Sequence, residues 1–214
     1  MGFHPFSLLL ELLFPKSDLE RRTEHANLDT LSRKCAPRTV GPFAEALFPY
    51  RDTAVRELLW TFKYHKQAKV AQLLGFFLFE HLLSEAGENS GFFDPERTVL
   101  IPIPTTAKRR RKRGYDQALL LAREIEKQSR GLFVVRDDVL FKKRKRTHQT
   151  NIASRTKREE NIRGSFKVLH EEQVKEKTII LIDDVITTGA TVSEARKMLL
   201  QKGALEVRAL CVAH

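Results

Sequence analysis

One stretch decides the fold: Lys177-Thr178-Ile179-Ile180-Leu181-Ile182-Asp183-Asp184-Val185-Ile186-Thr187-Thr188-Gly189-Ala190-Thr191. Its four consecutive large aliphatic residues, 179–182, are typical of a strand that is buried on both faces, as in a parallel sheet. Two carboxylates follow where that strand should leave the sheet. The apolar spacing of residues 192–200 then predicts a helix, which ends before Gly203. This order of elements indicates a ligand site at the end of a sheet.

The loop between the strand and the helix has the chemistry of a phosphate site. The first N–H groups of a helix lack partners within it, and the helix dipole favours an anion there. Glycine allows a positive φ and a close approach of the backbone to the ligand, and threonine hydroxyls can donate to phosphate oxygens. We therefore expect five residues to hold a phosphate group: Thr187, Thr188, Gly189, Ala190 and Thr191.

The acid pair suits another part of the same ligand, because carboxylates repel phosphate. Asp183 and Asp184 are suited to sugar hydroxyl groups or to a hard divalent cation such as Mg²⁺. Ligands of open α/β sheets bind beyond the carboxyl ends of the strands, where this pair would lie. An ordinary solvated connection between strand and helix would explain the acid pair taken alone. It explains the whole run less well.

A second anion site is predicted after an earlier strand. Residues 98–101 form a short apolar run, and Pro102 and Pro104 should end that strand. The loop that follows carries two hydroxyl groups and then a basic block, so four residues are candidates for binding a second anionic group: Thr105, Thr106, Lys108 and Arg109. Each basic residue taken alone could equally be a solvated surface residue.

The net charge of +11 is confined to two blocks of the chain. Lys108–Arg113 contributes six positive charges and Lys142–Arg146 contributes five, and the remaining chain has 27 basic and 27 acidic residues. Such blocks indicate a polyanionic partner, either pyrophosphate or nucleic acid, or both. The alternative is two solvated loops that keep the protein soluble.

The rest of the chain alternates between helices and strands, which predicts an α/β fold with a mainly parallel sheet. An apolar face at Val55, Leu58, Leu59 and Phe62 predicts one helix, and a second should run from about residue 67 to 83. A third is expected over 116–128, with Leu119, Leu120, Ala122 and Ile125 turned inward. Short strands are expected at 132–135, 139–141, 165–169 and 206–213. We interpret Tyr50, Trp60, Phe62 and Tyr64 as packing aromatics rather than a platform for stacking bases.

The long polar segment 142–164 has no apolar content to bury, and we expect it to end in a short helix through Asn161. Such a segment can act as a lid that excludes water from a site, or as an arm that contacts nucleic acid. Its candidate residues are Arg144, Arg146, Gln149, Arg155, Arg158 and Asn161. We interpret His148 as an exposed loop residue rather than a catalyst.

Length and composition limit the remaining classes. A chain of 214 residues, 42% of them hydrophobic, suggests one domain with an accessory piece or two small domains. Two cysteines, Cys35 and Cys211, cannot form a disulfide framework and fit a reducing compartment. The apolar run 6–14 is too short to span a bilayer and lacks the plan of a signal peptide, so we expect a cytoplasmic protein without membrane insertion. No GxGxxG motif precedes a helix, and neither a P-loop lysine motif nor a nucleophile-elbow serine is present.

Taken together, several segments resemble the competence protein F family, whose members are similar to type I phosphoribosyltransferases. The stretch that begins at Lys177 resembles the motif by which those enzymes bind phosphoribosyl pyrophosphate (PRPP). The other matching pieces are Leu12-Leu13-Phe14-Pro15, Phe48-Pro49-Tyr50, Phe62-Lys63-Tyr64, Ile101-Pro102-Ile103-Pro104, Arg113-Gly114-Tyr115-Asp116-Gln117-Ala118, and Thr147-His148-Gln149 with Arg155, Arg158, Asn161, Gly164 and Phe166.

The resemblance implies a type I phosphoribosyltransferase fold: a mainly parallel twisted sheet flanked by helices over residues 49–214, with a small helical and loop-rich cap at 1–48. It implies that residues 187–191 bind the 5′-phosphate of PRPP. Asp183 and Asp184 would then be the catalytic acids at the ribose hydroxyls or Mg²⁺. The four candidates of the second anion site would bind pyrophosphate, which leaves if a phosphoribosyl group is transferred.

Two further expectations follow from the family. Its members take part in uptake of single-stranded DNA during natural transformation, beside a helicase partner, so a DNA-binding factor without catalysis is the alternative function. They usually carry paired cysteines near the start, in a zinc-binding module. Here Ser17 and Glu20 stand where the first pair would be, so we interpret 1–48 as a degenerate zinc-module region and expect no zinc. The acceptor of a transfer and the oligomeric state, including a homodimer, stay open.

Overall fold

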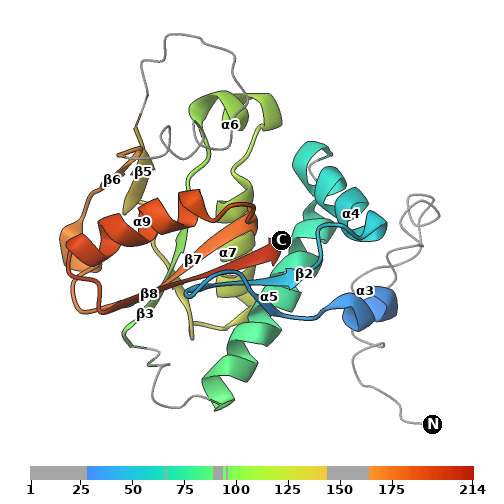
Figure 1. The fold of residues 1–214 in the computed structure, drawn as a ribbon, viewed down its shortest axis with the longest axis horizontal. Coiled ribbons are helices and arrows are strands. Elements are labelled where there is room, and N and C mark those ends of the chain that lie inside the picture. Colours follow the sequence, from blue (N-terminus) through green and yellow to red (C-terminus); the bar gives the residue numbers. More distant parts are fainter. Residues whose placement is uncertain (1–27, 66, 89–93, 95, 144–163) are drawn as a thin grey trace.

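The structure is a computed structural model that describes residues 28–65, 67–88, 94, 96–143 and 164–214. Its centre is a six-stranded sheet with the strand order β1-β2-β8-β7-β3-β4 (Figure 1). All neighbouring pairs in this sheet are parallel except β1 with β2 at one edge. The strands are β1 (Arg38–Thr39), β2 (Ala44–Phe48), β8 (Glu206–Ala213), β7 (Thr178–Val185), β3 (Thr98–Pro102) and β4 (Val134–Val135). The expected α/β architecture with a mainly parallel sheet is confirmed.

The two central strands are buried on both faces. Residues 178–182 of β7 are all buried, as are the five residues of β3 beside it. Because side chains alternate along a strand, each of these strands supplies apolar groups to both sides of the sheet. The sheet therefore needs a separate hydrophobic core on each face.

Helices α4 (Thr53–Tyr64), α5 (Ala68–Glu88) and α7 (Gln117–Gln128) form the core on one face with Ile180 and Ile182 of β7. On the other face, α9 (Ala190–Gln201) packs on Ile179 and Leu181 (Figure 1). The second core also includes a small antiparallel pair, β5 (Leu140–Lys142) and β6 (Phe166–Val168). The remaining described helices are α3 (Leu28–Lys34), α6 (Ala107–Arg113) and the 3₁₀ turn η2 (Glu171–Gln173).

The helical periodicities agree with the structure in most places. The apolar face of α4 is buried at Val55, Leu58, Leu59 and Phe62, as predicted. Helix α7 is rotated from the expected orientation, because Leu119 and Leu120 are only half-buried. Its buried residues are Gln117, Ala118, Leu121, Ala122 and Ile125. Ala122 belongs to the core that α7 shares with α5 and the sheet.

The boundary expected after residue 48 does not separate a cap from the sheet. Strand β2 pairs with β8 from Ala44↔Ala209 to Phe48↔Ala213, and Leu47 and Phe48 belong to the core. The sheet-bearing body thus begins before Ala44, and residues 1–27 lie outside the described part of the chain. Among the described residues, none of the helices combines the length and apolar character that crossing a bilayer requires.

The crossing of α5 and α7 depends on a glycine, which gives a test of the fold. A Cβ atom at Gly75 would lie 2.5 Å from the Cβ of Glu124, so Gly75→Ala must push the two helices apart. We expect a loss of roughly 1–3 kcal/mol from overpacking, offset by up to about 1 kcal/mol of helix propensity. For a chain of this size each kcal/mol lowers Tm by about 2–4 °C in thermal unfolding.

Gly87→Ala is the matched control, because Gly87 lies in the same helix and a Cβ there meets nothing within 4 Å. That variant should be neutral or slightly more stable. Equal Tm shifts for the two variants would contradict the close helix crossing.

Candidate functional site

The acid pair lies at the carboxyl edge of the sheet, within β7 rather than after it. Strand β7 continues to Val185, which pairs with Ala213 of β8, and Asp183 pairs with Cys211. The strand continues past its apolar run because β8 supplies partners for it along that length. Both carboxylates are therefore held by a hydrogen-bonded strand rather than by a loop.

Strand alternation places the two acids on opposite sides of β7. Asp184 follows Ile180 and Ile182 on the side of α4, α5 and α7, whereas Asp183 follows Ile179 and Leu181 on the side of α9. The backbone N–H of Asp184 donates to Oδ1 of Asp183 at 2.8 Å. Burial, and next the negative charge of Asp184, raise the pKa of Asp183 well above its ordinary value. The acid pair thus carries charge that the fold does not fully compensate.

Asp184 is neutralised by a residue from a distant part of the chain. Nζ of Lys63, near the end of α4, lies 2.9 Å from Oδ2 of Asp184, and both side chains are largely buried. This carboxylate oxygen accepts no aligned hydrogen bond from the described residues, so the contact is chiefly one of charge. The ion pair positions a primary amine directly at the predicted ligand site.

Two further contacts hold the end of α4 against the site. The hydroxyl of Tyr115 donates a hydrogen bond to the carbonyl oxygen of Phe62. The guanidinium of Arg113 lies over the ring of Tyr64, 5.7 Å from its centroid. Lys63 therefore lies between two residues that are both attached to the segment 113–116, and α4, that segment and the acid pair form one connected unit.

The hydroxyl-rich loop lies where the sequence predicts it, between β7 and α9. Thr187 and Thr188 are exposed, and Gly189 takes a left-handed conformation (φ 73°) at the start of α9. The N–H of Ala190 donates a long hydrogen bond, 3.4 Å, to the hydroxyl of Thr188. Among the described residues no side chain caps α9 at Gly189, so its start can receive an acceptor from a ligand.

The second predicted anion site follows β3, the parallel neighbour of β7. The N–H of Ile103 donates to the carbonyl oxygen of Ile182 at 2.9 Å, so this segment begins directly beside the acid pair. The N–H of Thr105 donates to Asp116 at 3.0 Å, and Thr106 is the N-cap of α6. Lys108 and Arg109 are exposed on that helix. The basic block, expected in a loop, therefore forms the helix α6, which ends at the left-handed Gly114.

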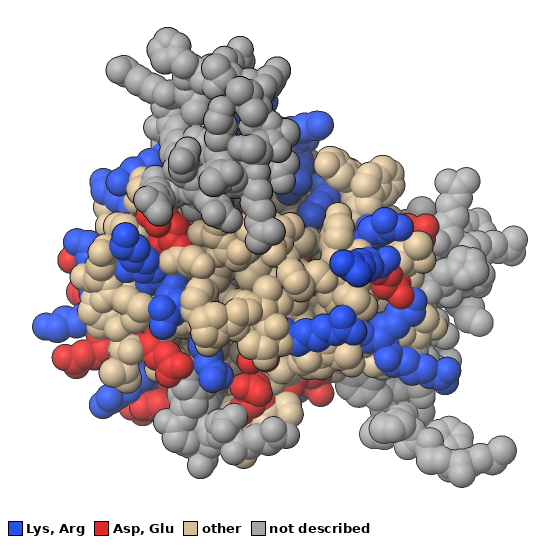
Figure 2. All heavy atoms as spheres, in the orientation of Figure 1, with Lys and Arg blue, Asp and Glu red and all other residues tan. Residues whose placement is uncertain are grey.

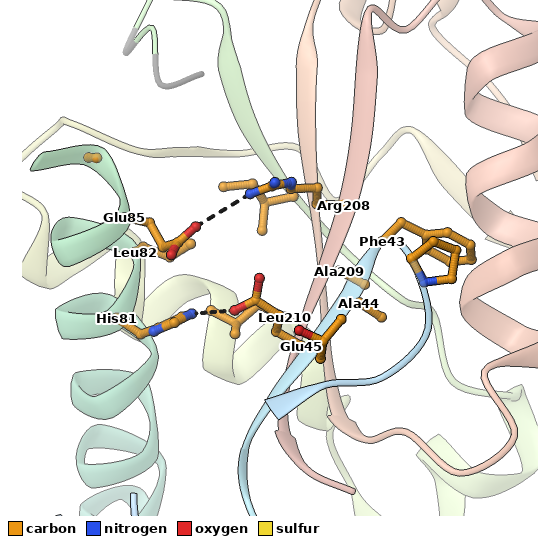
Figure 3. Close-up of a pocket in the computed structure, with 13 residues that line it drawn as sticks. Phe43, Ala44, Glu45, His81, Leu82, Glu85, Arg208, Ala209 and Leu210 are labelled. Carbon is orange, nitrogen blue, oxygen red and sulfur yellow. Dashed lines mark hydrogen bonds and ion pairs between the residues drawn. The ribbon is translucent and has the colours of Figure 1, made fainter. Parts of the chain in front are cut away.

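Another cluster of metal-ligating side chains lies away from this edge, in a pocket between α5, β2 and β8 (Figure 3). One ligand atom from each of Glu45, His81 and Glu85 falls within 4.8 Å of the others. Nε2 of His81 lies 2.9 Å from Glu45, whose pKa this hydrogen bond lowers, and Arg208 lies 3.4 Å from Glu85. The charges pair with each other, so we interpret this cluster as fastening α5 to the edge of the sheet.

Some predicted residues are not described, and one residue of the site was not predicted. The candidates of the polar segment, which are Arg144, Arg146, Gln149, Arg155, Arg158 and Asn161, lie outside the described residues. Lys63 had no predicted role. Its position just after Phe62, the last buried residue of the α4 face, was the available signal, but nothing in the sequence shows what that end of the helix contacts.

Comparisons with known proteins identify a family and several similar proteins. Residues 78–214 match the phosphoribosyl transferase domain family. DNA utilization protein YhgH of Escherichia coli (strain K12) is 28% identical over 176 residues, which cover 82% of this chain and 70% of that protein. Competence protein F of Haemophilus influenzae is 32% identical over 111 residues, or 51% of this chain and 47% of that protein. Competence protein ComFC of Bacillus subtilis is 30% identical over 114 residues, or 53% of this chain and 43% of that protein.

The raised pKa of Asp183 has a consequence for stability. Below the ordinary pKa of aspartate the carboxyl is protonated in both the folded and unfolded states. As the pH rises, the unfolded state ionises first, so the folded state loses stability until the pH passes the folded pKa. Asp183→Asn mimics the protonated form and should raise stability at neutral pH by an amount on the order of 1 kcal/mol, or about 2–4 °C in Tm.

The gain should vanish as the pH falls below about 4. Asp52→Asn is the control, because the pKa of Asp52 is lowered, chiefly by its hydrogen bond from Lys34, so the same substitution should bring no gain. Thermal unfolding across pH measures both variants. An Asp183→Asn protein that is less stable than the wild type at neutral pH would be incompatible with an uncompensated carboxylate.

Proposed function

Because the chain belongs to the phosphoribosyl transferase domain family, we propose that it binds PRPP with Mg²⁺ at the edge where β3 and β7 end. Its similarity to the competence proteins and to DNA utilization protein YhgH supports the same family. One observation carries the proposal. An acid pair of which Lys63 neutralises only Asp184 lies at the end of a buried strand, and the chain runs from it directly into a hydroxyl-rich turn and a helix start without a side-chain cap from the described residues. Such an edge offers acceptors for sugar hydroxyl groups and donors for phosphate within a few residues of each other.

Each part of the ligand has a matching group in the proposed site. Thr187, Thr188, Gly189, Ala190 and Thr191 would hold the 5′-phosphate, because hydroxyl and backbone N–H donors meet at the start of α9. Asp183 and Asp184 would accept from the ribose hydroxyls or hold Mg²⁺. Thr105, Thr106, Lys108 and Arg109 would face the pyrophosphate, because β3 delivers them to the same edge.

The acid pair fits a divalent cation on the chemistry of its donors. Mg²⁺ prefers carboxylate oxygens, and it usually keeps several water molecules and binds substrate phosphates at the same time. When bound, it would neutralise charge on the carboxylates and the pyrophosphate. The raised pKa of Asp183 fits this arrangement, since the present surroundings leave that carboxyl short of positive charge. Lys63, which now supplies positive charge to Asp184, would share that role with the metal or give it up.

A transfer of the phosphoribosyl group would use the same residues. Positive charge would develop at the ribose, where the acid pair stabilises it, and negative charge at the departing pyrophosphate, where Lys108 and Arg109 neutralise it. The proposal does not include an acceptor, because the described residues that form the site account for the ribose and the phosphates alone.

Titration calorimetry of PRPP in the presence of Mg²⁺ tests the proposed site. The double variant Asp183→Asn, Asp184→Asn should weaken binding at least about tenfold, which corresponds to about 1.4 kcal/mol. The matched control is Asp137→Asn, Asp138→Asn, since these adjacent acids lie at the turn between β4 and β5 and removing them changes the net charge equally. Absence of heat at millimolar PRPP, or equal losses in both double variants, would refute the site.

A second candidate function rests on α6. Lys108 to Lys112 are all exposed, and together with Arg113 they concentrate six positive charges on a helix of seven residues. Figure 2 shows basic atoms in the upper part of this face, where Figure 1 draws α6. Two of the relatives are named for competence and one for DNA utilization. We therefore propose that the protein also binds single-stranded DNA in the cytoplasm, beside a helicase partner, whether or not it transfers a phosphoribosyl group.

The salt dependence of DNA binding separates this role from PRPP binding. For a labelled single-stranded oligonucleotide, Arg110→Gln, Arg111→Gln, Lys112→Gln should reduce the slope of log K against log [salt] by roughly 2, because each lost phosphate contact removes about 0.7. Arg110→Lys with Arg111→Lys keeps the charge and should keep the slope. An affinity that does not change with salt would exclude α6 as the contact.

A further inference from the structure

A groove runs beside α4 on the side that faces away from the core. Three aromatic rings line it, from Tyr50, Trp60 and Tyr64, together with the charged side chains of Arg56, Lys63 and Arg113. We call this surface the aromatic groove. Its volume is about 440 Å³, within the range of sites that bind small ligands. Lys63 lines the groove and also pairs with Asp184, so one side chain contacts both the groove and the acid pair.

The aromatic residues of this region were expected to pack, and only one of them is buried. Phe62 is fully buried, whereas 56% of Trp60, 48% of Tyr64 and 41% of Tyr50 is exposed. Trp60 and Tyr64 are four residues apart and so lie on one face of α4, with ring centroids 5.8 Å apart. Exposed clusters of large aromatic side chains are rare on soluble proteins unless they bind something.

The charges around the rings define the ligand further. Arg56, Lys63 and Arg113 are set against one acidic lining residue, Glu57. Arg113 is also the last residue of α6, so the positive surface of that helix begins at the groove. A ligand that fits must therefore carry flat rings for stacking and a chain of negative charge that leads away along α6.

We propose that the aromatic groove binds unpaired bases of a single-stranded nucleic acid, which stack on Trp60 and Tyr64 while the phosphates lie against Arg56, Arg113 and α6. Stacking on aromatic side chains beside a cationic track is how proteins hold single strands without reading their sequence. A duplex would not fit, because its bases are stacked on each other. The inference rests on the proposed DNA binding and adds to it a place for the bases.

The sequence contains one tryptophan, Trp60, so its fluorescence reports directly on the groove. The test compares an oligothymidylate with an abasic strand of the same length and charge. We expect the base-bearing strand to quench Trp60 to saturation and the abasic strand to leave it unchanged. We also expect the base-bearing strand to bind roughly 5- to 30-fold more tightly, because base stacking on aromatic side chains has about this effect.

Substitutions complete the test through the anisotropy of labelled strands. Trp60→Ala should weaken oligothymidylate binding roughly 5- to 30-fold, with little change for the abasic strand and an unchanged salt slope. Trp60→Phe should restore most of the affinity. Leu205→Ala removes an equally exposed apolar side chain elsewhere and should have no effect.

The outcomes separate the two proposals. If neither strand binds, the proposed DNA binding fails and the groove proposal fails with it. If both strands bind equally, or if Trp60 is not quenched at saturation, α6 binds DNA and the groove does not. Quenching by an acidic peptide that displaces the oligothymidylate from the wild type and from Trp60→Ala alike would also overturn the proposal, since stacking would then not be the cause.

Discussion

The rest of the structure depends on one electrostatic constraint, the placement of two adjacent carboxylates at the end of a buried strand. Burial and the negative charge of Asp184 both oppose ionisation of Asp183, whose pKa is raised well above its ordinary value. Asp184 meets part of that cost through Lys63 of α4. For the lysine to reach the acid, α4 must be held at the carboxyl edge, and it is held there by four buried apolar residues and by the hydrogen bond from Tyr115 to Phe62.

The parallel sheet converts this constraint into a site. Strands β3 and β7 are far apart in the chain, yet their ends meet, so the segment after Ile103 and the acid pair share one edge. Separate cores on the two faces bury the central strands, and the acid pair at the edge is held by the hydrogen-bonded strand β7 rather than by a loop. The apolar cores that stabilise the fold are thus separate from the polar edge groups that we propose to bind the ligand.

The sequence predicts the local patterns well and the long-range contacts poorly. The buried run of β7, the turn at Gly189 and the apolar face of α4 are fixed by neighbouring residues, and all three are where the sequence places them. The ion pair of Lys63 with Asp184 joins residues far apart in the chain, so no local pattern encodes it. Helix α6 escaped prediction because six consecutive basic residues have no apolar period. Its ends are set by Thr106 and Gly114, whose roles appear only in the folded backbone. The exposure of Trp60 could not be predicted for the same reason. The sequence spacing predicts on which face of the helix Trp60 lies, but it does not predict whether another part of the protein covers that face.

The single ammonium group of Lys63 pairs with Asp184 of the acid pair, and the same side chain lines the aromatic groove. Whatever occupies either position changes the positive charge left for the other, and thermodynamic reciprocity makes that influence equal in both directions. If the acid pair and the aromatic groove bind their ligands as we propose, the protein has a means of cooperativity between them. It needs no domain movement for this, because the side chain that would carry the signal already touches both.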